Sequence, residues 1–175
     1  LQTAIHHGVR FLDNMIDVQV FHIPEIEAQQ KRERRIGLGT LGLAEMLIRL
    51  GMRYSSQESL LQIDEIYRFI AIEAYRASAL LAAEKGTFPA YNQKMLGRPF
   101  LQQIKAADAE VWALIKEHGL RNVTLLTVAP TGTGSTMVDT SGGIEPFFRW
   151  EYTRNGLFGS AKVRVPVLDE LIDSR

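Results

Sequence analysis

One segment constrains the fold of this chain more than any other: residues 122–128, NVTLLTV, which are apolar and rich in β-branched side chains. A run of that length and composition, bounded by turn-forming residues, predicts a buried β-strand. The strand leads directly into a loop with two glycines at residues 130–135. Because most of the chain before it has helical periodicity, the sequence predicts a helix-rich α/β fold in which one strand carries a glycine-rich loop.

The part of the chain before this strand is mainly helical by pattern. Ser55 and Glu58 have the spacing of a capping box at the start of a long helix. Residues 25–35, in which acids interleave with bases, are expected to form a solvated face or loop. Residues 90–106 should be a loop with room for a short helix. Apolar residues at three- and four-residue steps predict helices over residues 3–20, 35–50, 57–84 and 107–118.

Shorter elements are predicted after the strand. Residues 141–148, SGGIEPFF, form a second glycine-rich turn that contains a carboxylate, Glu145. A turn at Asn155-Gly156 should be followed by a strand at residues 162–165 and a short helix from Val167. For Glu145 we favour a structural carboxylate that accepts backbone N–H bonds over an acid–base role.

The aromatic residues near this second turn allow two interpretations. They could stack on a nucleotide base, or they could pack in a core, which we favour. They are Phe147, Phe148, Trp150 and Tyr152.

Composition excludes several classes of function. The 175 residues include 20 basic and 20 acidic side chains, so the formal net charge is zero and no global positive field attracts nucleic acid. No apolar stretch approaches the ~20 residues of a membrane-spanning helix. The absence of cysteine excludes disulfides, zinc–thiolate sites and thiol or thiyl chemistry on this chain. The four histidines have no metal-binding spacing. We therefore expect a cytoplasmic protein with no metal site and no nucleic-acid or membrane partner.

The domain organisation is expected to be simple. We treat residues 1–175 as a single segment, mainly helical over 1–120 and carrying the strand and loop over 121–175. The chain begins at Leu1 with residues that already have helical spacing. We interpret this start as the sign of a piece of a longer protein.

Residues 37–42, GLGTLG, match the dinucleotide-binding pattern G-x-G-x-x-G. In a dinucleotide fold these glycines follow a buried strand and open a helix, so that the pyrophosphate meets the helix N-terminus. Here a highly charged segment precedes them, and apolar spacing continues through them as one helix. We therefore reject a nicotinamide-binding enzyme and expect these glycines to let a neighbouring backbone come close.

The loop after the strand has the composition of an anion site. Its glycines permit positive φ and close approach of a ligand, and successive backbone amides can form an anion-binding nest. A helix that begins near Ser135 would add partial positive charge, and the hydroxyl groups can donate to phosphate oxygens. The loop lacks the G-K-[ST] ending of a Walker loop, and its spacing alone also fits a polar turn with N-capping hydroxyls. Its members are Pro130, Thr131, Gly132, Thr133, Gly134 and Ser135.

Four blocks in order resemble the large chain of ribonucleotide reductases, and together they cover nearly the whole sequence. The wording of the phosphate loop is more similar to the adenosylcobalamin-dependent class, class II, than to the di-iron class. The blocks are RRIGLGTLGLAEML at 34–47, GMRYSS at 51–56, GLRN at 119–122, and APTGTGS at 129–135 with SGGIEPFF at 141–148.

The resemblance implies part of a ten-stranded α/β barrel that makes 2′-deoxyribonucleotides for DNA synthesis from ribonucleoside diphosphates or triphosphates. It implies adenosylcobalamin as the cofactor of the full enzyme, with none bound to this chain alone. It assigns the substrate's phosphates to residues 130–135. The catalytic cysteines would lie in the remainder of the barrel, so this chain would carry no catalytic residue.

A different class of function stays open. The chain could be a non-catalytic helical module that completes or binds a partner chain. A partial barrel also leaves strand edges and apolar surface uncovered, which predicts self-association.

Overall fold

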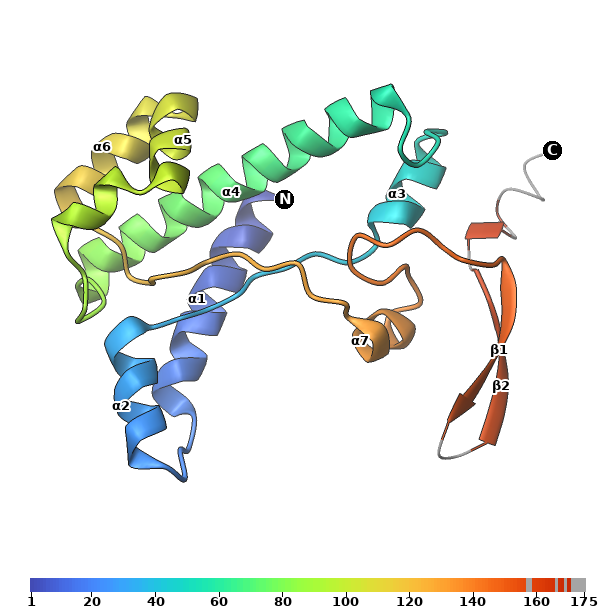
Figure 1. The fold of residues 1–175 in the computed structure, drawn as a ribbon, viewed down its shortest axis with the longest axis horizontal. Coiled ribbons are helices and arrows are strands. Elements are labelled where there is room, and N and C mark those ends of the chain that lie inside the picture. The colour runs from blue at the N-terminus through green and yellow to red at the C-terminus, as the bar shows by residue number, and fades with distance from the viewer. Residues whose placement is uncertain (157–158, 166, 169, 171–175) are drawn as a thin grey trace. The chain divides into compact units, whose positions relative to one another are not determined.

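The computed structural model describes residues 1–156, 159–165, 167–168 and 170 (Figure 1). The chain divides into two compact units, unit 1 with residues 1–38 and 64–127 and unit 2 with residues 39–63 and 128–175. The elements are α1 (Gln2–Val18), α2 (Pro24–Glu33), α3 (Leu43–Arg49), α4 (Gln57–Lys85), the 3₁₀ helix η1 (Gln93–Gly97), α5 (Pro99–Ala107), α6 (Ala109–His118), α7 (Gly132–Met137), β1 (Glu151–Gly156) and β2 (Gly159–Arg164).

The first core of unit 1 forms between α1 and α4, and it confirms the predicted helices at 3–20 and 57–84 to within two residues. Apolar residues of the two helices meet at three- and four-residue spacing, as an amphipathic pair should. Val20, the last residue of the predicted helix at 3–20, lies beyond the end of α1 and is exposed. The buried members of this core are Ile5, Val9, Ile16, Ile36, Ile70, Ala74, Ala77, Leu81 and Leu125.

A second core in unit 1 packs α5 and α6 against α4. The predicted helix at 107–118 is confirmed as α6, and Asp108 caps it by accepting a hydrogen bond from Val111 N at 2.8 Å. For residues 90–106 the prediction of a loop with a short helix contained too little helix, because these residues include η1 and the whole of α5. Pro99 lies at the N-terminus of α5, where a missing N–H costs nothing.

The predicted helix at 35–50 is wrong over its first half. Residues 36–42 are not helical, and only α3 forms the predicted helix; residues 36–38 instead pair with another segment. Ile36 N donates to Thr124 O at 3.2 Å and Leu38 N donates to Leu125 O at 2.7 Å. Three glycines lower the helix propensity of this segment. It therefore pairs with a neighbouring extended segment, although the spacing of its apolar residues is that of a helix.

That neighbour is the predicted strand at 122–128. It is extended and its central Leu125 is buried, as expected. It pairs with residues 36–38 through a single parallel bridge between Leu38 and Leu126, and Val123 N donates to Glu33 O at 3.1 Å. The buried strand is therefore present as an extended segment rather than as a member of a larger sheet.

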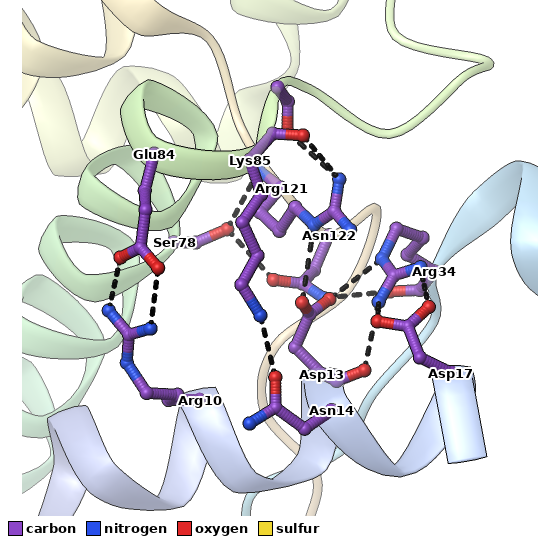
Figure 2. A network of polar contacts seen from close by, with 11 residues as sticks. Arg10, Asp13, Asn14, Asp17, Arg34, Ser78, Glu84, Lys85, Arg121 and Asn122 are labelled. Atoms are coloured by element: carbon purple, nitrogen blue, oxygen red, sulfur yellow. Dashed lines mark hydrogen bonds and ion pairs between the residues drawn. The ribbon is translucent and has the colours of Figure 1, made fainter. Parts of the chain in front are cut away.

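A buried polar network links α1 to the amino ends of both extended segments (Figure 2). Asp13 on α1 is 0% exposed. Its carboxylate accepts hydrogen bonds from Arg34 Nε at 2.8 Å and Asn122 Nδ2 at 2.9 Å. Arg121 Nε adds a third contact to the same carboxylate at 3.2 Å. Asp17 binds the other nitrogens of the Arg34 guanidinium, at 2.8 and 2.9 Å.

The charged residues 25–35 form a helix, α2, rather than a loop, and no residue of α2 is buried. The prediction of a solvated face is confirmed for α2. It fails at Arg34, which follows the helix in the left-handed region (φ 47°) and is only 5% exposed. A buried arginine in a charged run is invisible to a pattern of residue types, because its partner Asp13 lies 21 residues away.

In unit 2, the first turn of α4 is capped by Ser56 rather than by the predicted Ser55. Ser56 Oγ accepts a hydrogen bond from Ser59 N at 3.2 Å, while Ser55 takes a left-handed backbone (φ 64°). The predicted capping residue was therefore one position too early in the chain.

The two strands of unit 2 that the structure describes, β1 and β2, form an antiparallel hairpin. Gly156 pairs with Gly159, so the Asn155-Gly156 dipeptide belongs to β1 and is not the predicted turn. The residues between the strands, 157–158, lie outside the described residues. The predicted strand at 162–165 is confirmed in β2, which begins earlier, at Gly159. Most of the helix predicted from Val167 also lies outside the described residues.

In the part of the chain that the structure describes, no helix combines the length and the apolar character that crossing a bilayer requires.

Candidate functional site

The predicted phosphate loop joins the extended segment 122–127 to α7. This helix begins at Gly132, not near Ser135 as expected, so the loop is shorter and most of its residues belong to the first turns of α7. The left-handed conformation falls on Thr131 (φ 26°) rather than on a glycine. Gly132 and Gly134 have ordinary φ values, and a Cβ added to either would meet no atom within 4 Å. These two glycines are therefore not needed for an unusual backbone conformation; what they provide is open space beside the loop.

Two hydroxyl groups of the loop, those of Thr131 and Ser135, are already engaged within unit 2. Thr131 Oγ1 accepts a hydrogen bond from Gly143 N at 2.7 Å and makes no cap bond to α7. The alternative prediction, that the loop hydroxyls cap the helix, therefore does not hold for Thr131. Its O–H remains able to donate, because a hydroxyl carries one donor besides its acceptor sites. Ser135 Oγ donates to Gly132 O at 3.2 Å.

The second glycine-rich turn, residues 141–148, lies directly against the first loop. Gly143 has φ 48°, and a Cβ there would lie 2.7 Å from Ala129 O. A Cβ on Gly142 would lie 3.5 Å from Pro130 O. Thr140 N also donates to Ser135 O at 3.0 Å. Sequence reasoning noted both loops but did not connect them; two glycine-rich turns that close on one another are the signal that it missed.

Both loops border one cavity of about 290 Å³ in unit 2. Of the six predicted loop residues, Pro130, Gly132 and Ser135 line it, while Thr131, Thr133 and Gly134 do not. The remaining lining residues are Thr136, Asp139, Thr140, Ser141, Gly142, Glu145, Pro146, Phe147, Phe148, Tyr152, Val163, Arg164 and Val165.

The charges around this cavity are mixed. Asp139 and Glu145 contribute carboxylates, and Arg164 contributes a guanidinium that also lies 3.4 Å from Glu151. The loop itself contributes only neutral groups. The cavity can therefore offer amide and hydroxyl donors at the loop and carboxylate acceptors elsewhere, which suits a ligand that carries both an anionic group and hydroxyl groups.

Two of the four aromatic residues near the second turn are more exposed than expected. Phe148 is 74% exposed and Trp150 is 50% exposed, so the expectation of core packing is wrong for these two. The rings of Phe148 and Tyr152 lie 4.7 Å apart between centroids, at an interplanar angle of 48°. Both rings line the cavity.

Metal chemistry finds no support in the described ranges. No group of three or more His, Asp or Glu side chains there is arranged to hold a metal ion. The sequence holds no cysteine at any position.

Comparison with known proteins gives a consistent result. A sequence profile for "Ribonucleotide reductase, barrel domain" matches residues 1–175. The chain is 36% identical to the "Vitamin B12-dependent ribonucleoside-diphosphate reductase" of Mycobacterium tuberculosis over 96% of its length and 22% of that protein. It is 33% identical to a protein of the same name from Thermoplasma acidophilum, over 97% of the chain and 20% of that protein.

A relative with a different name matches to a similar degree. The "Ribonucleoside-diphosphate reductase subunit alpha" of Chlamydia trachomatis is 31% identical over 91% of the chain and 17% of that protein. The chain thus spans about a fifth of the length of the curated relatives that it matches.

Proposed function

The chain belongs to the ribonucleotide reductase barrel-domain family, and we propose that it supplies the substrate-phosphate loop of a ribonucleoside-diphosphate reductase. In this proposal residues 1–175 are a single segment of the catalytic barrel domain. The observation that carries the proposal is the cavity in unit 2, because the loop predicted from sequence lines it through Pro130, Gly132 and Ser135. The complete enzyme would convert ribonucleotides to 2′-deoxyribonucleotides for DNA synthesis.

The loop would bind phosphate through neutral donors. The first amides of a helix have no acceptor within the helix, so those around Gly132 to Gly134 can donate to phosphate oxygens. The Thr131 hydroxyl can add a further donor, because its bond to Gly143 N uses it only as an acceptor. Neutral donors without a lysine predict weak binding by this chain alone, on the order of millimolar or about 4 kcal/mol.

The rest of the cavity favours a nucleotide over inorganic phosphate. Glu145 and Asp139 would repel a phosphate placed beside them, but they can accept hydrogen bonds from sugar hydroxyls. The exposed Phe148 and its neighbour Tyr152 each offer an apolar ring, tilted 48° to the other, on which a base or sugar face can lie.

The cofactor of the complete enzyme is proposed to be adenosylcobalamin. Two of the relatives named above are vitamin B12-dependent, and the loop APTGTGS resembles that class. When bound, adenosylcobalamin supplies the radical that starts the reaction. This chain has no thiol to carry a radical or to reduce a substrate, so the part we assign to its residues is to bind and orient the phosphates.

The proposed partners follow from the same division of labour. The cysteine-bearing remainder of the barrel would be the main partner, and the isolated chain is expected to self-associate through its uncovered apolar surface. Among the described residues of unit 2 that surface includes Val128, Met137, Val138 and Phe148, each more than 60% exposed. A cytoplasmic location stays a prediction.

The proposal is tested by titrating the isolated chain with ribonucleoside diphosphates, ribonucleoside triphosphates and NAD. We expect weak binding of the nucleotides that inorganic pyrophosphate competes away, and no binding of NAD. The isolated chain should have no reductase activity with adenosylcobalamin and a thiol. Turnover by the pure chain would contradict the assignment of catalysis to other residues. If neither the chain nor the complete enzyme binds phosphate at this loop, the structural-module alternative stands instead.

A further inference from the structure

Residues at the start of α3 are joined to residues just before the second glycine-rich turn, about a hundred positions later in the chain. Gly42 N donates to Ser141 O at 2.8 Å. Thr140 Oγ1 donates to Glu45 Oε2 at 2.7 Å, and Glu45 N lies 3.4 Å from Ser141 Oγ. We name these three contacts the α3 clamp; all its members lie in unit 2.

The clamp depends on the last glycine of the G-x-G-x-x-G pattern. Gly42 has φ 84°, and a Cβ there would lie 2.9 Å from Thr140 Oγ1. Gly42 is also the N-cap of α3 and has no side chain to accept an amide of the first turn. The capping acceptor comes from another segment of the chain instead: Ser141 Oγ faces Glu45 N, the amide at the third helical position. At Gly42 the motif therefore serves the close approach of residues 140–141.

The carboxylate of Glu45 is held on both of its oxygens. Oε2 accepts from Thr140, and Oε1 accepts from Arg49 one turn later, at 2.8 and 3.0 Å. The Glu45 side chain is 12% exposed and Ser141 is 3% exposed. Charge-assisted hydrogen bonds in a mostly dry setting are stronger and more directional than neutral ones in water, so Glu45 has one preferred position.

The clamped residues border the cavity and touch the phosphate loop. Thr140 and Ser141 line the cavity. Thr140 N donates to Ser135 O at 3.0 Å, and two residues beyond Ser141 the amide of Gly143 donates to Thr131 Oγ1 at 2.7 Å. A displacement of residues 140–141 would therefore shift both ends of the loop.

We propose that Glu45 is a positioning residue for the phosphate site, acting through Thr140 and Ser141. The proposal rests on the phosphate-binding function proposed above. Glu45 would not touch the substrate. It would fix the position of Thr140 and Ser141, which contact the phosphate loop, so that the amide donors are in place before the ligand binds. Such preorganisation increases affinity because less ordering is left to the binding step.

The test uses the complete reductase that carries this segment, and it measures dissociation constants for ribonucleoside diphosphates and for the matching nucleosides. The quantity compared is the ratio of the two constants, because a nucleoside has no phosphate to lose. Glu45→Ala should weaken diphosphate binding about tenfold, because part of the ordering of the amide donors is then left to the binding step. It should leave nucleoside binding within about twofold. A variant that only lowered the folded fraction would weaken both ligands equally and leave the ratio unchanged.

Two further variants sharpen the result. Glu45→Gln keeps an acceptor oxygen for Thr140 and should recover most of the diphosphate affinity. Thr140→Val removes the hydroxyl at nearly constant volume, and combined with Glu45→Ala it should cost little more than Glu45→Ala alone, because both changes break the same bond. If Glu45→Ala does not fold, Thr140→Val with Thr140→Ser as its conservative partner tests the same contact.

The control is Glu58→Ala, which removes an exposed glutamate from the first turn of another helix of unit 2, α4, away from the cavity lining. It should leave both dissociation constants unchanged. If Glu45→Ala leaves the ratio unchanged while Gly132→Val raises it, the positioning role is wrong and the phosphate loop stands. If neither variant changes the ratio, the loop does not bind phosphate, and both proposals fall together.

Discussion

The two units of this chain hold their irregular segments by different chemistry. In unit 1, buried charges do so: Asp13, Arg34 and Arg121 anchor the amino ends of two extended segments (Figure 2). In unit 2, glycines and short hydroxyl side chains bring two loops into hydrogen-bond contact, at 2.7 Å between Gly143 N and Thr131 Oγ1, and the loop that faces the cavity carries no charge of its own.

The difference matters for what each region can do. A buried ion pair fixes a segment firmly, but it leaves no unsatisfied group for a ligand; in the described residues every buried side-chain nitrogen or oxygen has a partner. Loops held by backbone contacts keep amides directed at open space, and such amides can bind an anion without prior charge neutralisation. Under the function proposed above, unit 1 would serve as the scaffold and unit 2 would carry the binding site.

The largest expected effect comes from breaking the buried network. Asp13→Asn keeps the volume but removes the charge that Arg34 and Arg121 share. Removal of one partner from a buried ion pair leaves the others uncompensated, so we expect a loss of about 3–5 kcal/mol in the free energy of unfolding. Urea unfolding measures it, with Glu84→Gln, in an exposed pair with Arg10, as the control. A loss no larger than that of the control would mean that the network is not what holds unit 1.

The contact between the two loops of unit 2 should be the next most sensitive. Gly143→Ala places a Cβ 2.7 Å from Ala129 O at φ 48°, so backbone must shift, and we expect a cost of about 1–3 kcal/mol. Gly51→Ala is the matched control: it has φ 70° but open space around the added Cβ, so it reports the backbone strain alone. Equal costs in urea unfolding would show that the loops can separate freely.

The phosphate loop itself should respond in binding rather than in stability. Gly132→Val places a branched side chain in the open space beside the first turn of α7, where a ligand would approach. We expect about a tenfold loss of nucleoside-diphosphate affinity in the complete enzyme, equivalent to about 1.4 kcal/mol. Thr133→Ser keeps the hydroxyl and should change affinity little. If Thr133→Ser abolishes binding while Gly132→Val does not, hydroxyl groups rather than backbone amides recognise the phosphate.

The sequence was a good guide wherever structure is decided locally. Apolar spacing predicted α1, α4 and α6, because a helix that buries one face must repeat at that period. The same rule failed at residues 36–42, where spacing through the glycines mimicked a helix while residues 36–38 pair with residues 124–127 instead. A period cannot reveal a partner that lies 88 residues away.

The candidate site could be predicted in outline and not in mechanism. Its residues came from composition and a family resemblance, but the expected reason, positive φ at the glycines, is wrong, since Thr131 takes that conformation and Gly132 does not. The closure of the second turn on the loop and the α3 clamp escaped prediction, because each joins distant segments through a few specific hydrogen bonds that residue types alone do not assign to partners.

The smallest expected effect lies at the exposed edge of the buried network. Asp17 binds the Arg34 guanidinium but is 47% exposed, and the hydrogen bond from Arg34 lowers its pKa, against the opposing effect of burial. A carboxyl whose pKa is depressed on folding stabilises the protein above its unfolded pKa of about 3.9, and loses that contribution as the pH falls through its folded value.

Asp17→Asn should therefore cost about 0.2–1 kcal/mol at pH 7, the range for exposed pairs. The gap between wild type and variant should narrow as the pH falls below about 4, because the carboxyl of the unfolded chain then takes up a proton while the folded carboxyl follows at lower pH. Urea unfolding at pH 7 and at pH 3 measures both values. A gap as wide at pH 3 as at pH 7 would mean that Asp17 acts through shape rather than charge, and that the ionic character of the network is confined to its buried members.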